Sequence, residues 1–133
     1  MQTVVLDACA LIAYIHREKG ASLVERHLND PGKEIVMHVV NFYEVYYNSL
    51  RTQPGLVSLL DELIKKAGIK IYPRLDKRIM SEGAALKIHY KMSLADSIAI
   101  GLSNKLKATL LTADRHEFGE IAQEKLVKIK FIR

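Results

Sequence analysis

The feature that most constrains the fold is the alternation of short, apolar, β-branched segments with longer segments of helical spacing. Buried strands are predicted at residues 3–6, 35–37, 69–72, 109–111 and 127–131. Apolar residues recur at helical intervals over residues 10–16, 21–28, 40–52, 56–67, 75–89 and 94–106. Such alternation favours a doubly wound α/β fold, in which helices cover both faces of a central, mostly parallel, five-stranded sheet. The sequence therefore predicts a three-layer α/β/α architecture.

Length and composition indicate one globular domain. The chain has 133 residues, of which 49% are hydrophobic and 26% charged, and we expect one domain over residues 1–133 because no repeat, low-complexity tract or linker divides it. No apolar run approaches the ~20 residues that span a bilayer, and the single cysteine, Cys9, excludes an intrachain disulfide. These features predict a cytoplasmic protein that does not enter a membrane.

The charge balance is basic. Twenty Lys and Arg against fifteen Asp and Glu give a formal net charge of +5 and a pI near 9.3. A polyanionic partner such as a nucleic acid is compatible with this excess, although many basic proteins bind nothing anionic.

Four acidic residues occupy positions that an α/β topology brings toward one edge of the sheet. Asp7 interrupts an apolar run and follows the first predicted strand, while Asp114 follows the strand at residues 109–111. Glu44 and Asp96 lie on apolar-rich helical segments. Ligands of doubly wound sheets bind outside the carboxyl ends of the strands, so these positions predict a binding site.

Each acid taken singly also has a structural explanation. Asp7 is suited to cap the helix that follows it, and Asp96 could complete a capping box opened by Ser93. Asp114 could cap a further helix, with Glu117 three residues later. The coincidence of four acids at one edge favours a functional site over four independent caps.

Converging carboxylates require a compensating charge. Glu44 has no capping role and could instead pair with a nearby Lys or Arg, but two carboxylates ~4 Å apart repel by roughly 4 kcal/mol at an effective dielectric constant of about 20. Oxygen ligands without a set of His or Cys favour Mg²⁺ or Mn²⁺. The five histidines show no zinc spacing, and His116 is the one placed to reach the site.

These motifs also carry a family resemblance. The segments VVLDACALIAYI, the helical Glu44 after Val40-Asn41, and KMSLADSIAIGLSNKLKATLLTADRHEF together resemble a PIN domain over residues 3 to about 132. The most specific blocks are SLADSIAI and LLTAD, and the chain is most similar to the compact toxin ribonucleases of the VapC type. The resemblance implies a parallel sheet between helical layers and RNA cleavage that depends on Mg²⁺ or Mn²⁺.

The resemblance also assigns roles to residues. The implied catalytic and metal-binding acids are Asp7, Glu44, Asp96 and Asp114. Asp7 and Asp96 are expected to be the core ligands, Glu44 an assisting ligand or base, and Asp114 an outer or second-metal ligand. Thr112 matches the hydroxyl residue of a T-x-D segment, and Ser93 is expected to support Asp96.

One position departs from the family pattern. Many relatives have Ser or Thr two residues after the first aspartate, whereas this chain has Cys9, and a thiol is a poorer hydrogen-bond donor than a hydroxyl. The support of Asp7 is therefore expected to differ. Arg17, Lys91 and Arg115 lie near the motif segments and are candidate contacts to the RNA backbone, or ordinary surface charges.

The toxin resemblance implies two protein partners. A cognate antitoxin would place a basic side chain beside Glu44 and Asp96, and a homodimer is expected. Large amphipathic rings near the motif helices are compatible with an interface or with interior packing: Tyr14, Phe42, Tyr43, Tyr46 and Tyr47.

Other functions remain open at this point. The chain could be a housekeeping PIN-type RNA-processing nuclease or a non-catalytic metal- or RNA-binding module. An aspartyl phosphatase is disfavoured because Asp7-Ala8-Cys9 lacks the second aspartate of a D-x-D arrangement.

Overall fold

The computed structural model describes residues 1–133 and contains one five-stranded sheet whose paired strands are all parallel. The strands are β1 (Gln2–Leu6), β2 (Lys33–His38), β3 (Ile69–Tyr72), β4 (Thr109–Thr112) and β5 (Ile129–Phe131), in the spatial order β3-β2-β1-β4-β5. The chain moves outward from β1 through β2 and β3 and then returns to the other side of β1 with β4 and β5. The predicted doubly wound fold is confirmed, with a sheet that is wholly rather than mostly parallel.

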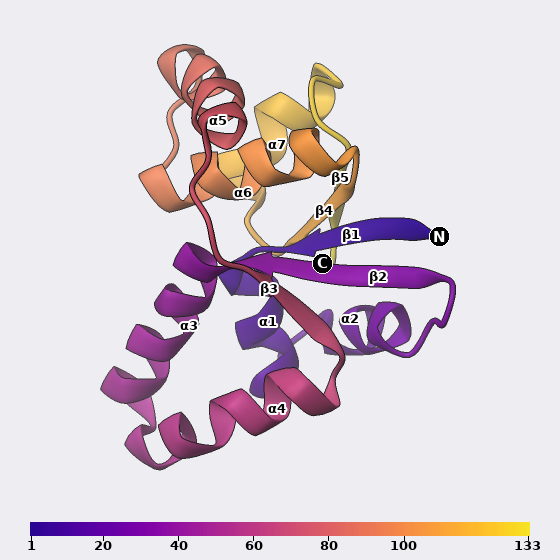
Figure 1. Cartoon of the computed structure of the whole chain (residues 1–133), viewed down its shortest axis with the longest axis vertical. Coiled ribbons are helices and arrows are strands. Elements are labelled where there is room, and N and C mark those ends of the chain that lie inside the picture. The colour runs from indigo at the N-terminus through magenta and orange to yellow at the C-terminus, as the bar shows by residue number, and fades with distance from the viewer.

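Helices cover both faces of the sheet (Figure 1). One face carries α1 (Ala8–Ile15), α2 (Ala21–Leu28), α3 (Val39–Thr52) and α4 (Leu60–Lys66). The other face carries α5 (Lys77–His89), α6 (Leu94–Leu106) and α7 (Arg115–Gln123). The carboxyl ends of β1 and β2 lead into α1 and α3 at one edge of the sheet. The amino ends of these strands lie at the opposite edge, where the N-terminus of the chain is found (Figure 1).

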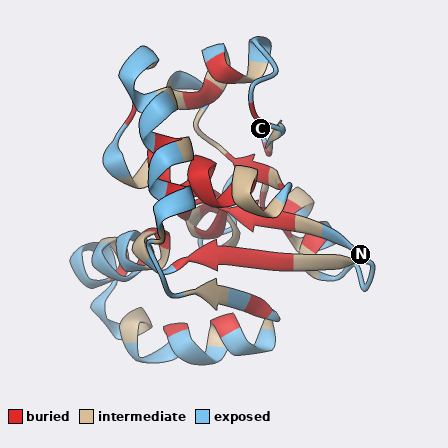
Figure 2. Cartoon of the chain, turned by 45° about the horizontal axis from the view of Figure 1, so that its top comes forward, coloured by how far each residue is buried: buried red, intermediate tan, exposed pale blue.

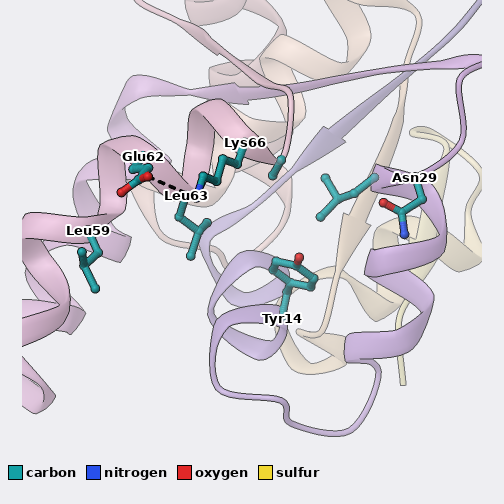
Figure 3. Close-up of a pocket in the computed structure, with 8 residues that line it drawn as sticks. Tyr14, Asn29, Leu59, Glu62, Leu63 and Lys66 are labelled. Atoms are coloured by element: carbon teal, nitrogen blue, oxygen red, sulfur yellow. Dashed lines mark ion pairs between the residues drawn. The ribbon is translucent and has the colours of Figure 1, made fainter.

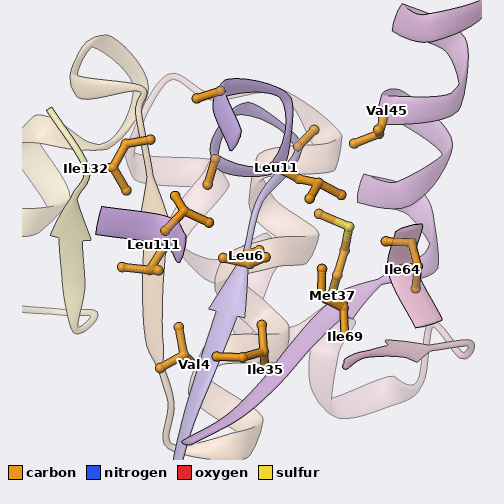
Figure 4. Packing of buried hydrophobic residues seen from close by; sticks show 14 of the residues in the cluster. Val4, Leu6, Leu11, Ile35, Met37, Val45, Ile64, Ile69, Leu111 and Ile132 are labelled. Atoms are coloured by element: carbon orange, nitrogen blue, oxygen red, sulfur yellow. The ribbon is translucent and has the colours of Figure 1, made fainter. Parts of the chain in front are cut away.

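The sheet separates two apolar cores. Successive strand residues point to opposite faces, so Val4 and Leu6 pack with α1 to α4 while Val5 packs with α5 to α7. Figure 4 shows the first of these cores, in which Leu6 lies among Leu11 and Met37. Because both faces of the central strands are covered, they form the buried centre of the molecule (Figure 2).

Three predicted elements differ from the observed ones. The helix predicted at residues 56–67 is instead a 3₁₀ helix, η1 (Pro54–Leu59), followed by the α-helix α4, with Pro54 at the start of the first turn. Helix α5 begins at Lys77 rather than at residue 75, because Asp76 caps it by accepting a hydrogen bond from the Ile79 N–H at 3.0 Å. Helix α7 was anticipated only as a helix that Asp114 could cap, without bounds, and it spans Arg115–Gln123. None of the helices combines the length and apolar character needed to cross a membrane.

Two glycines allow α5 and α6 to pack closely. A Cβ atom added at Gly83 would overlap the carbonyl oxygen of Ser97, and one added at Gly101 would overlap that of Ile79. Backbone atoms cannot move aside as a flexible side chain can. We therefore expect Gly83→Ala or Gly101→Ala to lower the free energy of unfolding by about 1–3 kcal/mol, measured by urea denaturation.

Gly119 provides the matched control for this prediction. It lies inside α7, and an added Cβ would meet no atom within 4 Å. Gly119→Ala should raise the free energy of unfolding by roughly 0.5–1 kcal/mol, because alanine is the better helix former. The same response at all three glycines would contradict the packing argument.

Candidate active site

Asp7 is held at the carboxyl end of β1 by two neighbouring elements. Its side chain is 1% exposed. Oδ1 accepts a hydrogen bond from the Ala10 N–H at 2.9 Å, which caps α1. Oδ2 accepts a hydrogen bond from the hydroxyl of Thr112, the last residue of β4. Asp7 is therefore both a helix cap and a fixed, buried carboxylate at the point where the strand order reverses.

Thr112 links Asp7 to a second carboxylate. Its Oγ1 accepts a hydrogen bond from the Asp114 N–H at 3.0 Å while donating to Asp7. Asp114 in turn caps α7, because its Oδ1 accepts a hydrogen bond from the Glu117 N–H at 2.9 Å. The Asp114 Oδ2 has no hydrogen-bond partner within the chain.

Asp96 brings a third carboxylate from α6. Ser93 caps this helix by accepting a hydrogen bond from the Asp96 N–H at 3.1 Å. The reciprocal half of a capping box is not formed, because the Ser93 N–H does not donate to the Asp96 carboxylate, although the Ser93 side chain favours the charged acid and lowers its pKa. Ser93 orients the first turn of α6 and leaves the acid available to a ligand.

Glu117 joins the cluster from the first turn of α7. One carboxylate oxygen from each of Asp96, Asp114 and Glu117 lies within 4.8 Å of the other two. The sequence interpretation treated Glu117 only as a companion of a helix cap. Its position three residues after Asp114, in the first turn of a helix at the carboxyl edge, was the signal that could have identified it.

Glu44 approaches the cluster from α3 beside a buried asparagine. Its side chain is exposed, and its charge contributes to raising the pKa of Asp96, which places the two carboxylates within electrostatic reach. Asn41 is fully buried, and its amide donates a hydrogen bond to the Ala95 carbonyl at 3.2 Å. The Asn41 Oδ1 accepts no hydrogen bond. Every other buried side-chain oxygen or nitrogen of the chain has a hydrogen-bond partner. An orphaned oxygen beside acids is suited to a bound water or a hydrated cation.

The carboxylates resist being charged together. Burial raises the pKa of Asp7 to about 7, although its hydrogen bonds from Thr112 and Ala10 oppose the shift, and Asp96 and Asp114 raise it further. Burial also raises the pKa of Asp96 to about 6, with the charges of Glu44, Glu117 and Asp114 adding to the effect. Partial burial of the carboxyl group raises the pKa of Glu44, while the Asn41 amide lowers it.

This donor set fits a hard divalent cation. All the groups are oxygen donors, and a bound cation would offset both the burial and the mutual repulsion that raise their pKa values. Mg²⁺ and Mn²⁺ prefer such oxygen ligands. His116 is exposed and lines a small cavity of about 150 Å³ next to Glu117, outside the three-carboxylate group.

Cys9 does not take part in the support of Asp7. No hydrogen bond joins the two side chains, and the Thr112 hydroxyl occupies that role. Partial burial of the thiol, together with Asp7, Asp114 and the other nearby carboxylates, raises the pKa of Cys9 to about 12. Cys9 therefore remains a neutral thiol at physiological pH and is unsuited to act as a nucleophile.

The three candidate RNA-contacting cations differ in their surroundings. Arg17 forms an ion pair with Glu25 at 3.2 Å. The Arg115 Nε donates a hydrogen bond to the Arg133 carbonyl at 2.8 Å. Lys91 is exposed without a carboxylate partner and lines the small cavity beside Glu117, so it is the cation of this set left available to a ligand.

A larger cavity lies away from the acids. It has a volume of about 430 Å³, and Tyr14, Leu59 and Leu63 are among its lining residues (Figure 3). An ion pair of 3.1 Å between Glu62 and Lys66 lies beside it. None of the clustered carboxylates lines this cavity, so it is separate from the candidate site.

Comparisons with known proteins identify the fold and the family. The family model described as PIN domain matches residues 4–124. Similar solved structures include a toxin-antitoxin complex from Klebsiella pneumoniae, with 15% identity, 98% coverage of both chains and a TM-score of 0.76. VapBC-1 from nontypeable Haemophilus influenzae has 18% identity, 98% coverage of both chains and a TM-score of 0.73. DNA-bound VapBC from Salmonella typhimurium has 12% identity, 100% coverage of both chains and a TM-score of 0.75.

No curated protein compared with the chain matches its sequence. The structural likenesses, all below one-fifth identity, show the fold alone. The family model covers most of the chain and the segments that carry all the clustered acids. The chain belongs to the PIN domain family.

Proposed function

We propose that the protein is a metal-dependent ribonuclease and the toxin of a toxin-antitoxin pair. The observation that carries the proposal is the convergence of Asp7, Asp96, Asp114 and Glu117, with Glu44 nearby, at the carboxyl edge of the sheet. Membership of the PIN domain family supports nuclease chemistry, and the likeness to toxin-antitoxin and VapBC complexes supports the toxin assignment.

The proposed site is a cation-holding group of carboxylates. Asp7 and Asp96 are assigned as core ligands, and Asp114 and Glu117 as ligands for the outer face or for a second ion. Bound Mg²⁺ or Mn²⁺ would neutralise charge on the phosphate and lower the pKa of an attacking water. Glu44, the exposed acid of the set, is assigned as an assisting ligand or as the base that would accept a proton from that water.

The substrate assignment predicts a preference for unpaired RNA. We expect single-stranded or loop RNA to be cleaved faster than duplex DNA, because an unpaired strand can bend so that one phosphate enters an open group of acids. Initial rates on end-labelled RNA and duplex DNA of equal length, at the same metal and salt concentrations, measure this preference. Equal rates would contradict it.

Helix α3 supplies the proposed protein interface. Tyr43 is 66% exposed and Tyr47 is 58% exposed, with Leu50 also exposed. Phe42 and Tyr14, by contrast, are half-buried against the core, so only part of the aromatic set is available to a partner. Exposed rings of this kind are favoured at interfaces because they bury a large area at a modest entropic cost.

The interface has a direct test in the oligomeric state. Tyr43→Ser combined with Tyr47→Ser is expected to shift the molar mass from dimer to monomer in light scattering, because it removes the largest exposed apolar area of α3. Ile88→Ser is the control, since Ile88 is 79% exposed but lies on α5. A monomeric wild-type chain, or equal effects of both changes, would contradict the assignment.

The antitoxin assignment requires a partner that silences the site. An antitoxin segment that brings a basic side chain to Glu44 and Asp96 would displace the cation by charge compensation. The chain should be expressed alone and with the open reading frame immediately upstream, followed by measurement of growth and RNA cleavage. Cleavage without toxicity would favour a housekeeping nuclease, and metal binding without cleavage would favour a non-catalytic module.

A further inference from the structure

A second charged region lies at the amino ends of the strands, opposite the carboxylates. A cavity of about 430 Å³ is bordered there by the first residues of β1 and β4, including Thr3 and Thr109. Four lysines line it: Lys33, Lys107, Lys128 and Lys130. A neighbouring cavity of about 200 Å³ shares two of them and adds Arg26. No part of the proposed function uses this basic cavity.

The positive charge of the basic cavity is largely uncompensated. Lys107, Lys128 and Lys130 form no ion pair with a carboxylate. Lys33 approaches Asp30 only at 3.9 Å, and its Nζ is hydrogen-bonded to the His27 Nδ1 at 2.9 Å. A group of cations around a hollow, with one distant carboxylate, attracts a polyanion.

The backbone of Lys107 determines which substitution is best suited to test this cavity. This residue ends α6 with φ 53° and ψ 42°, in the left-handed region where helices usually place glycine or asparagine. A lysine there is conformationally unfavourable, although glycine would remove the strain. Arg17 and Lys125 have the same left-handed backbone, so the conformation does not by itself mark a functional position, but it allows a substitution by glycine that relieves strain.

We propose that the basic cavity binds the phosphate backbone of the substrate RNA at a distance from the site of cleavage. The identity of the ligand rests on the proposed ribonuclease function. Beside the carboxylates, Lys91 is the one candidate cation left available, so further affinity for RNA phosphates would come from cations elsewhere on the surface. In this protein, the lysines of the basic cavity would supply this additional affinity.

Geometry limits which RNAs can use both regions. Strand β1, residues Gln2–Leu6, separates them by about 15 Å of sheet at ~3.3 Å per residue, and the path over the surface is longer. An RNA must therefore extend around the domain to reach the carboxylates and the basic cavity together. A folded or long single-stranded RNA meets this requirement, whereas a dinucleotide does not.

The test measures RNA binding at several salt concentrations. Asp7→Asn serves as the background, so that a long fluorescent single-stranded RNA stays intact, and affinity is followed by anisotropy with Mg²⁺ present. Adding Lys107→Gly should lower the slope of log K against log salt by about 0.7, as expected for one lost phosphate contact to a single strand. The same contact corresponds to about a fivefold loss of affinity at 0.1 M salt. Adding Lys128→Gln and Lys130→Gln should enlarge both effects.

Lys125→Gly is the matched control. Lys125 is exposed, has φ 58°, and does not line the basic cavity. Each glycine change removes one positive charge and relieves one left-handed residue, so both should raise the melting temperature by about 3 °C. Only the change at Lys107 is expected to weaken RNA binding, which separates ligand contact from folding and from net charge.

The outcomes separate this inference from the proposed function. Equal effects of the Lys107 and Lys125 changes on the salt slope would overturn the inference, even if the wild-type chain cleaves RNA. An equal loss of affinity for duplex DNA would overturn the assignment of RNA as the ligand. If the wild-type chain fails to cleave RNA but the Lys107 change weakens RNA binding selectively, the ribonuclease proposal fails and RNA binding by the basic cavity stands.

Discussion

Asp7→Asn is expected to abolish metal-dependent RNA cleavage while leaving the protein folded. Asparagine caps helices about as well as aspartate, and its side-chain amide can still form a hydrogen bond with the Thr112 hydroxyl. What is lost is the negative charge available to a cation. Cleavage of labelled RNA with Mn²⁺, together with circular dichroism, measures both parts of the prediction. Asp96→Asn should behave in the same way.

The size of the loss in RNA cleavage distinguishes a metal ligand, such as Asp7, from a residue that only orients it, such as Thr112. Thr112→Val, which removes only the hydroxyl that orients Asp7, should reduce cleavage by roughly 10- to 100-fold, and Asp7→Asn should reduce it further. Asp76→Asn is the control, because Asp76 also caps a helix but lies outside the cluster. A folded Asp7→Asn protein that retains full activity would rule out the assignment of Asp7.

The same substitution should stabilise the metal-free chain at alkaline pH. The pKa of Asp7 is raised to about 7, above the usual value of an unfolded aspartate, so the folded state binds the proton more tightly. Asp7 therefore reduces stability progressively as the pH rises from about 4 to 7, and the full penalty applies above pH 7. At pH 8 Asp7→Asn should raise the free energy of unfolding by on the order of 2–4 kcal/mol, and by much less at pH 5.

Urea denaturation in EDTA at the two pH values measures this difference. The comparison between variant and wild type is needed because burial lowers the pKa of His27 and of His38, which makes stability rise with pH over part of the same range. Those contributions cancel in the difference. Adding Mg²⁺ or Mn²⁺ at pH 8 should stabilise the wild type and not the variant. A variant less stable than the wild type at pH 8 would refute the electrostatic account.

Sequence reasoning succeeded where one physical signal dominated. Buried parallel strands are continuously apolar, so segments such as Val4 to Leu6 are visible without a structure. Asp7 was conspicuous for the same reason, as a charge inside an apolar run. The choice between cap and site was harder to make, and the structure shows that Asp7 caps α1 and also lies within electrostatic reach of Asp96 and Asp114.

The features that could not be predicted from the sequence depend on tertiary contacts. Glu117 resembles an ordinary capping partner until α7 is placed against α6, when its carboxylate meets that of Asp96. The unpartnered Asn41 oxygen is equally invisible, because burial of a polar atom is a property of the packed molecule. The 3₁₀ helix that begins at Pro54 was not predicted. Over so short a segment, apolar spacing alone does not distinguish a 3₁₀ helix, with three residues per turn, from an α-helix with 3.6.

The hydrogen bond between Thr112 and Asp7 joins residues 105 positions apart, and this separation affects when activity can arise during translation. The half-sheet of β1, β2 and β3 and the exposed rings of α3 are synthesised long before β4. Until β4 leaves the ribosome, Asp7 lacks its hydroxyl partner and neither Asp96 nor Asp114 is fixed beside it. A nascent chain therefore carries a surface for a partner before it carries a complete nuclease site. The proposed nuclease site is therefore completed only near the end of synthesis, after the strands of the half-sheet have been made.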